Sequence, residues 1–394
     1  MIVFYNPHID DFLAEPVQFR ILGRRALKKY GFMFEQAIIS NCKIRIFCDA
    51  TMSAVCPTFI FRRLPKVLRS LLCFFEVRLW VKLNKLSDHV VFVNELQISK
   101  FNDTLLAFSY KAAVGLFDER LTGFKRFKFV VFHLSHYFIS TSLKSENMEK
   151  LDNIFLAADS DFRDNLYFKS YFSWYKKAFL VLPFAVSGRF NAQQEFESRS
   201  DKIVATGSFH DLEKEPNSYL YRDFIQAFKI DTYHPLRKEI YYSREELEGV
   251  INTKISPYRD YAQSRLGRFI GFFNIAQKSY FSIDLVDLYN GHKLAVVGEE
   301  VSGAPALGAL EAMACGCVLI ASPQYLAGLG LEEGRHYLPY DGSLADLLLL
   351  KDGLDWESLD KISKAGTQII LEEFSELAVH GKWIQCLNSI EREL

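Results

Sequence analysis

The chain has 394 residues, of which 49% are hydrophobic and 24% are charged, and its formal net charge is −1. This length exceeds one typical core and predicts two domains. The near-zero charge excludes the strong basic excess of a nucleic-acid binder, so no nucleic-acid partner is expected. No apolar run reaches the roughly 18 residues of a spanning helix. The amino terminus has no basic segment or cleavage site, and the seven cysteines show no paired spacing, which predicts reduced thiols in the cytoplasm.

Short runs rich in Val, Ile and Phe recur along the chain, and helical stretches separate them. They lie at 2–5, 44–50, 90–96, 127–136, 153–159 and 178–184, and then at 202–209, 268–273, 292–300, 317–323 and 336–340. Most of these runs lack polar alternation, which is typical of parallel strands covered on both faces. The sequence therefore predicts an α/β fold in which two Rossmann-like, doubly wound domains face each other across a cleft.

The polar segment 187–202 separates the two series of strands. It predicts one domain over residues 1–198 and a second over 199–375. The remaining residues, 376–394, are expected to form a helix that packs back toward the first domain. In such folds ligands bind outside the carboxyl ends of the strands.

Residues 292–316 are predicted to form a strand, a small turn and a helix. Ser302 and Gly303 lie at the start of that helix, where free backbone N–H groups and the helix dipole favour an anion. Glu311 follows about two turns later, and its carboxylate can accept hydrogen bonds from two ribose hydroxyls. A plain strand–helix–strand unit with a solvent-facing glutamate is the alternative.

Three segments carry a family resemblance: "LGALEAMACGCVLIAS" (307–322), "LEEGRHYLPYDGSLADLLLLKD" (331–352) and "KAGTQIILEEFS" (364–375). They resemble the C-terminal half of GT-B glycosyltransferases of family four. The resemblance implies that 199–375 binds a nucleotide-sugar donor and that 1–198 holds the acceptor. It also implies that Gly207 and Ser208 form the glycine turn of the donor domain, and that Glu300 lies beside the bound donor.

The chain departs from family four at two points. Those enzymes have two glutamates eight positions apart; Glu311 matches the second, whereas the first falls on Gly303. Cations that would hold a diphosphate are not evident, and Lys214 is the nearest candidate. A diphosphate needs more cationic partners than a monophosphate, so a UDP- or GDP-hexose fits less well.

The stretch "KIDTYHPLRKEIYY" (229–242) contains the dipeptide His234-Pro235. Together with a Ser-Gly turn before a helix that carries a glutamate, it resembles GT-B enzymes that use CMP-sugars, namely bacterial sialyltransferases and Kdo transferases. This resemblance implies that His234 contacts the single phosphate and that Ser302 makes a second anionic contact. The combination is similar to the retaining β-Kdo transferases of family ninety-nine. It favours CMP-β-Kdo as donor and a role in O-antigen, capsule or lipopolysaccharide synthesis. A turn histidine before proline is the alternative.

A retaining transferase either delivers both steps on one face or forms a covalent glycosyl–enzyme, and the resemblance to the β-Kdo enzymes implies the second route, with an aspartate nucleophile. Asp231, three residues before His234, is the candidate. Asp159 and Asp161 follow a predicted strand across the cleft and are candidates for the acid/base that serves the acceptor hydroxyl. Turn and N-cap roles are the alternatives for all three. The "DSD" pattern at 159–161 lies in the acceptor-side domain, so neither a metal nor another cofactor is expected.

Histidines also fall near the expected cleft. His133 and His136 end a strand of the first domain, where they could contact the acceptor or the donor sugar. His210 follows the glycine turn of the second domain, where it could meet phosphate or a sugar carboxylate. Structural roles are the alternative for each.

Residues 59–86 mix Phe, Leu and Trp with seven cations against one acid, Glu76, and Pro65 divides the stretch in two. A basic apolar helix of this kind can lie on an anionic membrane surface, and lipid-linked acceptors would suit that position. The chain would then be cytoplasmic and peripheral at the inner membrane. A helix packed on the sheet with a basic outer face is the alternative.

Three other functions stay open. The chain could be a family-four-like hexosyltransferase that uses a UDP- or GDP-sugar. The missing first glutamate also leaves open a catalytically silent nucleotide-sugar binding module of a larger polymerase. An epimerase of the same fold would need carboxylates and a histidine around UDP and no acceptor.

Overall fold

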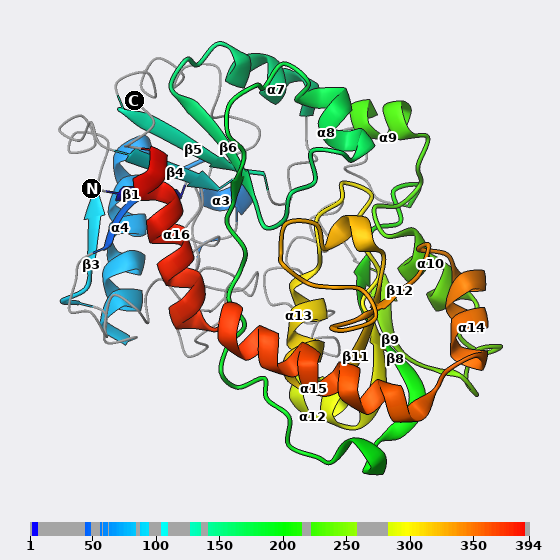
Figure 1. Ribbon diagram of the computed structural model, residues 1–394. Coiled ribbons are helices and arrows are strands. Elements are labelled where there is room, and N and C mark those ends of the chain that lie inside the picture. Colours follow the sequence, from blue (N-terminus) through cyan, green and yellow to red (C-terminus); the bar gives the residue numbers. More distant parts are fainter. Residues whose placement is uncertain are drawn as a thin grey trace.

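The computed structural model describes residues 2–6, 44–48, 56, 58–61, 63–83, 87–93, 104–108, 127–134, 141–214, 222–257 and 283–390. His136 and the strand expected at 268–273 lie outside the described residues. The described elements form two separate sheets joined by helices (Figure 1).

The first sheet has seven parallel strands in the order β3-β2-β1-β4-β5-β6-β7. Its strands are β1 (Ile2–Asn6), β2 (Ile44–Cys48), β3 (Val90–Val93), β4 (Thr104–Phe108), β5 (Phe129–His133), β6 (Ile154–Ala158) and β7 (Leu180–Val181). The helices of this part are α3 (Thr58–Phe61), α4 (Lys66–Leu83), α7 (Thr141–Glu149) and α8 (Leu166–Tyr171). Strand β4 was not predicted from the sequence, and it lies between β1 and β5.

The second sheet has five parallel strands in the order β12-β11-β10-β8-β9. Its strands are β8 (Ser200–Phe209), β9 (Ile251–Pro257), β10 (His292–Val296), β11 (Val318–Ala321) and β12 (Leu338–Pro339). Its helices are α9 (Arg222–Phe228), α10 (Pro235–Tyr242), α12 (Leu285–Asn290), α13 (Leu307–Ala314), α14 (Leu344–Asp352) and α15 (Trp356–Glu373), with short 3₁₀ turns at Phe196–Ser198 and Pro323–Tyr325. Strand β9, at the edge beside β8, was also not predicted.

Three strands are buried along their whole length, as the continuous apolar runs predict for sheets covered on both faces. Every residue of β5, β6 and β11 is buried. One apolar cluster contains residues of β5 and β6 as well as Ala312 and Met313 of α13 and Trp383 of the last helix. The two sheets therefore share part of their core.

The chain passes between the two sheets twice at nearly the same place. Val186, on the way from the first sheet to the second, pairs with Ser375 on the way back, and its N–H donates to the carbonyl of Phe374 at 2.8 Å. Helix α16 (Glu376–Ile390) then lies against the first sheet, whereas α15 covers the second (Figure 1). The indole N–H of Trp383 donates to the carbonyl of Pro183 at 2.7 Å, which holds α16 in place.

None of the described helices combines the length and the apolar character needed to cross a bilayer.

Candidate functional site

The site lies at the carboxyl ends of β8 and β10 in the second sheet. These strands are neighbours, yet the chain leaves β8 toward β9 on one side and returns to β10 on the other. The connections therefore diverge at this point, and such a switch point leaves a crevice where ligands bind in parallel α/β sheets. Gly207 and Ser208 end β8, and Gly298 follows β10.

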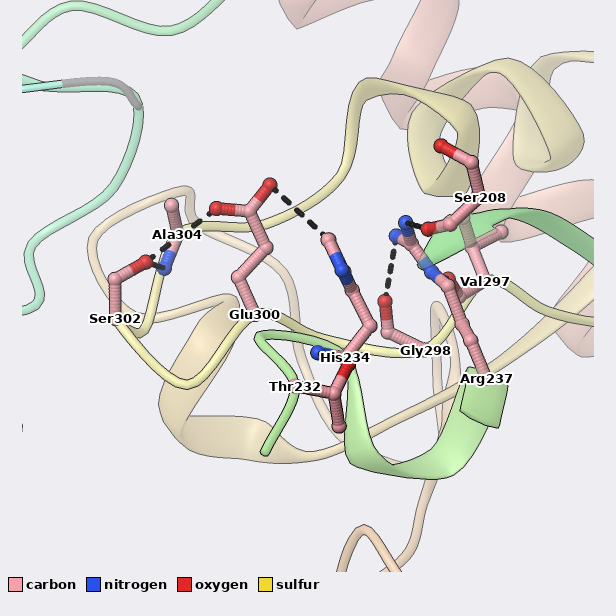
Figure 2. Close-up of polar contacts among 9 residues, drawn as sticks. All are labelled: Ser208, Thr232, His234, Arg237, Val297, Gly298, Glu300, Ser302 and Ala304. Atoms are coloured by element: carbon pink, nitrogen blue, oxygen red, sulfur yellow. Dashed lines mark hydrogen bonds and ion pairs between the residues drawn. The ribbon is translucent and has the colours of Figure 1, made fainter. Parts of the chain in front are cut away.

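Arg237 of α10 holds the two strand ends together (Figure 2). Its guanidinium donates to the carbonyls of Val297, Ser208 and Gly298 at 2.6, 2.9 and 2.7 Å. Both glycines have positive φ, +127° at Gly207 and +57° at Gly298. A Cβ at either position would lie within 2.9 Å of the Arg237 side chain, so only glycine fits without displacing the arginine.

Beside this arginine, three buried polar side chains form a short row that we call the His–Glu–Ser cluster: His234, Glu300 and Ser302 (Figure 2). The Nε2 atom of His234 lies 3.6 Å from Oε1 of Glu300. The hydroxyl of Ser302 donates to Oε2 of Glu300 at 3.5 Å and accepts from the N–H of Ala304 at 3.4 Å. His234 and Ser302, which the sequence analysis named as separate features of one resemblance, thus lie on either side of Glu300.

The His–Glu–Ser cluster owes its position to the start of α10 and to the turn before α13. Ser302 and Gly303, which were expected at the start of that helix, precede its N-cap, Ala306, by four and three residues. His234 is the N-cap of α10, and Pro235 at the first helical position fixes the backbone there. Val301 donates its N–H to the carbonyl of Tyr233 at 2.9 Å, which ties the turn before α13 to the start of α10. The His-Pro dipeptide and the Ser-Gly turn are 68 residues apart in the chain (302 minus 234) and meet here.

Burial governs the charge of the His–Glu–Ser cluster. Burial, and then the positive charge of Arg237, lower the pKa of His234 to about 4, although Glu300 acts in the opposite direction. The imidazole is therefore neutral at neutral pH and faces a carboxylate. Its Nδ1 atom is buried and has no hydrogen-bond partner among the residues that the structure describes. A buried nitrogen without a partner is unfavourable by about 1–3 kcal/mol, so a ligand group that reached it would be favoured.

His210 lies next to the same cluster. Its ring is stacked near that of His234, with centroids 6.4 Å apart and planes at 20°. It also contacts the ring of Tyr233 at 5.8 Å. His210 therefore adjoins the His–Glu–Ser cluster, and its contact with phosphate or a sugar carboxylate stays a prediction.

Gly303 lies where the second sheet's loops meet the first part of the chain. Its φ is +86°, and a Cβ there would lie 2.8 Å from the side-chain nitrogen of Asn165. Asn165 caps α8 by accepting the N–H of Tyr167 at 2.8 Å. The turn before α13 is thus in close contact with the start of α8.

Glu311 lies in α13, three residues after Gly308, and its side chain is near the space that a side chain on Gly308 would occupy. Its Oε2 is 3.9 Å from the position that a Cβ on Gly308 would take, and the Tyr289 hydroxyl is 3.2 Å from that position. The Tyr289 hydroxyl in turn bonds the hydroxyl of Thr206, next to Gly207, at 2.9 Å. Short contacts therefore connect the surroundings of Glu311 with the glycine turn of β8, although Glu311 is not part of the His–Glu–Ser cluster.

Asp231, the candidate nucleophile, is held by a lysine. Its Oδ2 accepts from the Nζ of Lys238 at 2.7 Å, and its side chain is 53% exposed. Lys238 also lies 3.5 Å from Asp211, which binds Lys214 at 2.8 Å. Asp231 therefore belongs to a chain of ion pairs beside α10, and Lys214 has a carboxylate partner.

The two aspartates after β6 have different surroundings. Asp159 is buried. Asp161 is bound by Arg163 through two short contacts of 2.8 and 2.6 Å, and this arginine lowers the pKa of the carboxyl group. The backbone N–H of Asp161 donates to the carbonyl of Ala327 at 3.0 Å, so Asp161 contacts the second part of the chain. A carboxylate held by arginine stays ionised, which suits a base better than an acid.

His133 is fully buried, which does not fit the cleft role suggested by the sequence. Its Nε2 is 2.9 Å from the carbonyl of Leu182, and its ring stacks on Trp383 with centroids 5.7 Å apart. The strand end where it lies is covered by α16, so the residue packs in the core. His136 lies outside the described residues.

Sequence reasoning missed two residues that shape the site. Arg237 was read only as part of the stretch 229–242. Glu299, adjacent to Glu300, accepts from the N–H of Ser322 and the hydroxyl of Tyr340, both at 2.7 Å, and so ties the ends of β10, β11 and β12 together. The one sequence signal that could have pointed to a site role for Arg237 is its position in the first turn of a helix, three residues after His234.

Within the described parts of the chain, no three His, Cys, Asp or Glu side chains are grouped as a metal site requires.

Comparisons with known proteins identify the fold. No protein-family model matches the chain, and no curated protein is similar to it in sequence. Among solved structures, it is similar to sucrose-phosphate synthase from Thermosynechococcus elongatus, at 14% identity over 100% of this chain and 99% of that one, with a TM-score of 0.54. It is similar to Anabaena HepE in complex with UDP and glucose at 11% identity, covering 98% and 99% of the chains, with a TM-score of 0.51. A glycosyltransferase from Rickettsia africae matches at 12% identity over 100% and 99%, with a TM-score of 0.51. The chain thus has the two-domain, Rossmann-like GT-B fold.

Proposed function

We propose that this protein is a glycosyltransferase that binds a nucleotide-sugar donor at the carboxyl edge of the second sheet. The observation that carries the proposal is the buried His–Glu–Ser cluster at the switch point between β8 and β10. Buried polar side chains are unfavourable unless they have partners, so their gathering at a ligand-binding edge favours a polar ligand. The GT-B fold, which the chain has in common with a UDP-bound Anabaena protein and a Rickettsia glycosyltransferase, supports this class of reaction.

We further propose CMP-β-Kdo as the donor and a retaining transfer to a surface-polysaccharide acceptor. The cations near the cluster support a monophosphate. Arg237 is engaged with three carbonyls, Lys238 with Asp231, and Lys214 with Asp211. A diphosphate carries more charge and needs more cationic partners than these engaged groups provide. In this proposal His234 and Ser302 hold the phosphate, while His210 meets phosphate or the sugar carboxylate.

The remaining predicted residues have roles in the same scheme. In this proposal the backbone at Gly207, Ser208 and Gly303 lines the donor site, and Glu311 accepts hydrogen bonds from the ribose hydroxyls. The carboxylate of Asp231 attacks the anomeric carbon, the bond from that carbon to the phosphate oxygen breaks, and CMP leaves with the electron pair. The acceptor hydroxyl then attacks the same carbon and gives its proton to Asp159 or Asp161, and the ester to Asp231 breaks.

The second candidate is a hexosyltransferase that uses a UDP-sugar. The Anabaena protein with a similar fold was solved with UDP and glucose, and this favours the alternative.

Titration calorimetry with CMP, UDP and GDP, followed by mass spectrometry after incubation with CMP-Kdo or UDP-glucose, tests both candidates. The proposal expects tighter binding of CMP, and with CMP-Kdo a mass increment of one Kdo on the peptide that contains Asp231. Ser302→Ala should weaken CMP binding about tenfold. Ser358→Ala is the matched control, because Ser358 is a half-buried serine of α15 that lies in the second part of the chain and has no place in the proposed site. Turnover of UDP-glucose without any reaction of CMP-Kdo would favour the alternative. Nucleotide binding without turnover of either sugar would indicate a silent module.

A further inference from the structure

Helix α4 presents an apolar face to solvent. Six of its large apolar side chains are exposed: Val67, Leu68, Leu71, Phe74, Phe75 and Leu79. Their spacing follows the 3.6-residue period of a helix, so they lie along one side, which we call the α4 face. Two of them are among the most exposed apolar side chains of the described residues, Val67 at 71% and Phe75 at 65%. A surface helix of a globular protein normally turns this stripe inward.

Cations border the α4 face. Lys66 begins the helix and Lys82 lies in its last turn, both exposed, and Arg63 is exposed just before it. Arg78 lies in line with the apolar stripe, and its guanidinium sits 4.7 Å from the ring centroid of Phe74. Segment 59–86 has a single acidic residue in its sequence, Glu76. The face is therefore apolar along most of its length, with one cation, Arg78, within the stripe and others at its two ends.

We propose that the α4 face binds the surface of an anionic phospholipid bilayer. The apolar side chains would enter the boundary between headgroups and acyl chains, and the lysines and arginines would contact lipid phosphates. Ile60 of α3, which precedes Pro65 in the chain, is also exposed. The helix would lie in the plane of the membrane surface without crossing it.

Charge favours a bilayer over a second copy of this chain. In a symmetric dimer, two α4 faces would bring two sets of Arg and Lys side chains together, and like charges would repel. An anionic bilayer supplies the opposite charge for every one of them and apolar volume for the phenylalanines. The combination of exposed apolar side chains and cations on one face therefore matches an anionic lipid surface.

The position of α4 leaves the proposed donor site accessible. In Figure 1, α4 lies on the side of the first sheet that is away from the second sheet, where β8 and β10 carry the His–Glu–Ser cluster. Binding to a bilayer through α4 would thus leave the second sheet's carboxyl edge uncovered. This inference does not depend on the proposed donor, because it rests on α4 alone.

Vesicle flotation of the whole chain tests the proposal. The probes are phosphatidylcholine vesicles with and without about 30% phosphatidylglycerol, at about 0.1 and 0.5 M NaCl. We expect the protein to float with the anionic vesicles only. The bound fraction should fall about tenfold or more at the higher salt concentration. The double variant Phe74→Ser/Phe75→Ser should reduce the bound fraction about tenfold or more, because two inserted aromatic rings are lost. Lys66→Glu/Lys82→Glu should reduce it as well, and more strongly at low salt.

Matched controls separate membrane binding from misfolding. Leu349→Ser changes an equally exposed leucine, at 71%, on α14 of the second part of the chain, and it should bind vesicles like the wild type. All variants should keep the thermal unfolding midpoint of the wild type, because these side chains are exposed. Equal binding of wild type and the Phe74/Phe75 variant, or no binding to anionic vesicles, would overturn the proposal. A concentration-dependent dimer that this variant abolishes, with no vesicle binding, would identify a second copy as the occupant.

Discussion

The Nε2 atom of His234 lies 3.6 Å from Oε1 of Glu300, at the point where the ends of β8 and β10 adjoin. Both side chains are buried, and burial lowers the pKa of His234 to about 4. At neutral pH the imidazole of this pair is therefore neutral. A phosphate that approaches the ring brings negative charge, which favours its protonated form.

Nucleotide binding should therefore take up a proton at His234. The bound phosphate raises the pKa of the ring from about 4, so the complex holds more protons than the free protein. It follows that the affinity for CMP rises as the pH falls from about 8 toward 5, and that no further gain occurs below the free pKa. Calorimetry at one pH in two buffers of different ionisation enthalpy measures the proton uptake directly.

The variant His234→Asn should abolish this proton uptake and flatten the pH dependence. His380→Asn is the matched control, because His380 is a half-buried histidine of α16 whose pKa is also lowered by burial. The control should bind CMP with the proton uptake of the wild type. Unchanged uptake in His234→Asn would show that another group takes the proton.

Removal of Arg237 should destabilise the second sheet. Arg237→Ala leaves the carbonyls of Ser208, Val297 and Gly298 without this donor, and each unpaired buried acceptor is unfavourable by about 1 kcal/mol or more. We expect a loss of at least about 3 kcal/mol in the free energy of unfolding, measured by urea denaturation. Arg237→Lys should recover only part of this, because one ammonium cannot reach three carbonyls in the same plane.

Arg335→Ala provides the comparison for Arg237. Arg335 is exposed and paired with Glu332, so its removal should change the free energy of unfolding by no more than about 0.5 kcal/mol. If Arg237→Ala is as mild as this control, the two glycine turns keep their positions without the guanidinium.

The elements around the site were predictable from sequence because their signals are local. Strand β11 is a run of buried apolar residues, and Gly316 before it has the positive φ, +85°, that often ends a helix. Strand β9 was missed because its residues are largely polar: only Ile251 and Ile255 are buried. As an edge strand paired with β8 alone, it has no need of a continuous apolar run.

The role of Arg237 could not be predicted from sequence because its partners are distant in the chain. The carbonyls of Val297 and Gly298 lie 60 and 61 positions away, and they reach the guanidinium only because β10 pairs with β8. His133 failed as a cleft residue for a similar reason. The helix that covers it comes from the far end of the chain, and its strand alone gave no sign of Trp383.

Gly303 should tolerate no side chain, for two separable reasons. Its φ of +86° disfavours any L-residue by roughly 1–2 kcal/mol, and a Cβ would lie 2.8 Å from the Asn165 side chain. Gly303→Ala should therefore lower the free energy of unfolding by more than backbone strain alone, and thermal denaturation should show it. Gly334→Ala isolates the strain, because its φ is +69° and no atom lies within 4 Å of the added Cβ.

The difference between these two alanine variants measures the contact with Asn165. Asn165→Ser shortens the side chain while a serine can still cap α8, so Gly303→Ala should be milder in this background. Equal effects of Gly303→Ala and Gly334→Ala would mean that the turn and α8 separate readily in solution.

Trp383 should be the main anchor of α16 on the first sheet. It is fully buried, donates to the carbonyl of Pro183 at 2.7 Å and stacks on His133. Trp383→Ala should cost about 3–5 kcal/mol in the free energy of unfolding, whereas Trp383→Phe, which loses the N–H and part of the ring, should cost about 1–2 kcal/mol. Leu377→Ala, at an exposed position of the same helix, should have an effect within about 0.5 kcal/mol.

Because α16 follows α15 of the second sheet, release of α16 in Trp383→Ala should also let the two sheets unfold separately. Urea denaturation of Trp383→Ala would then show two transitions, and a single transition at the wild-type midpoint would mean that α16 contributes little to holding the domains together.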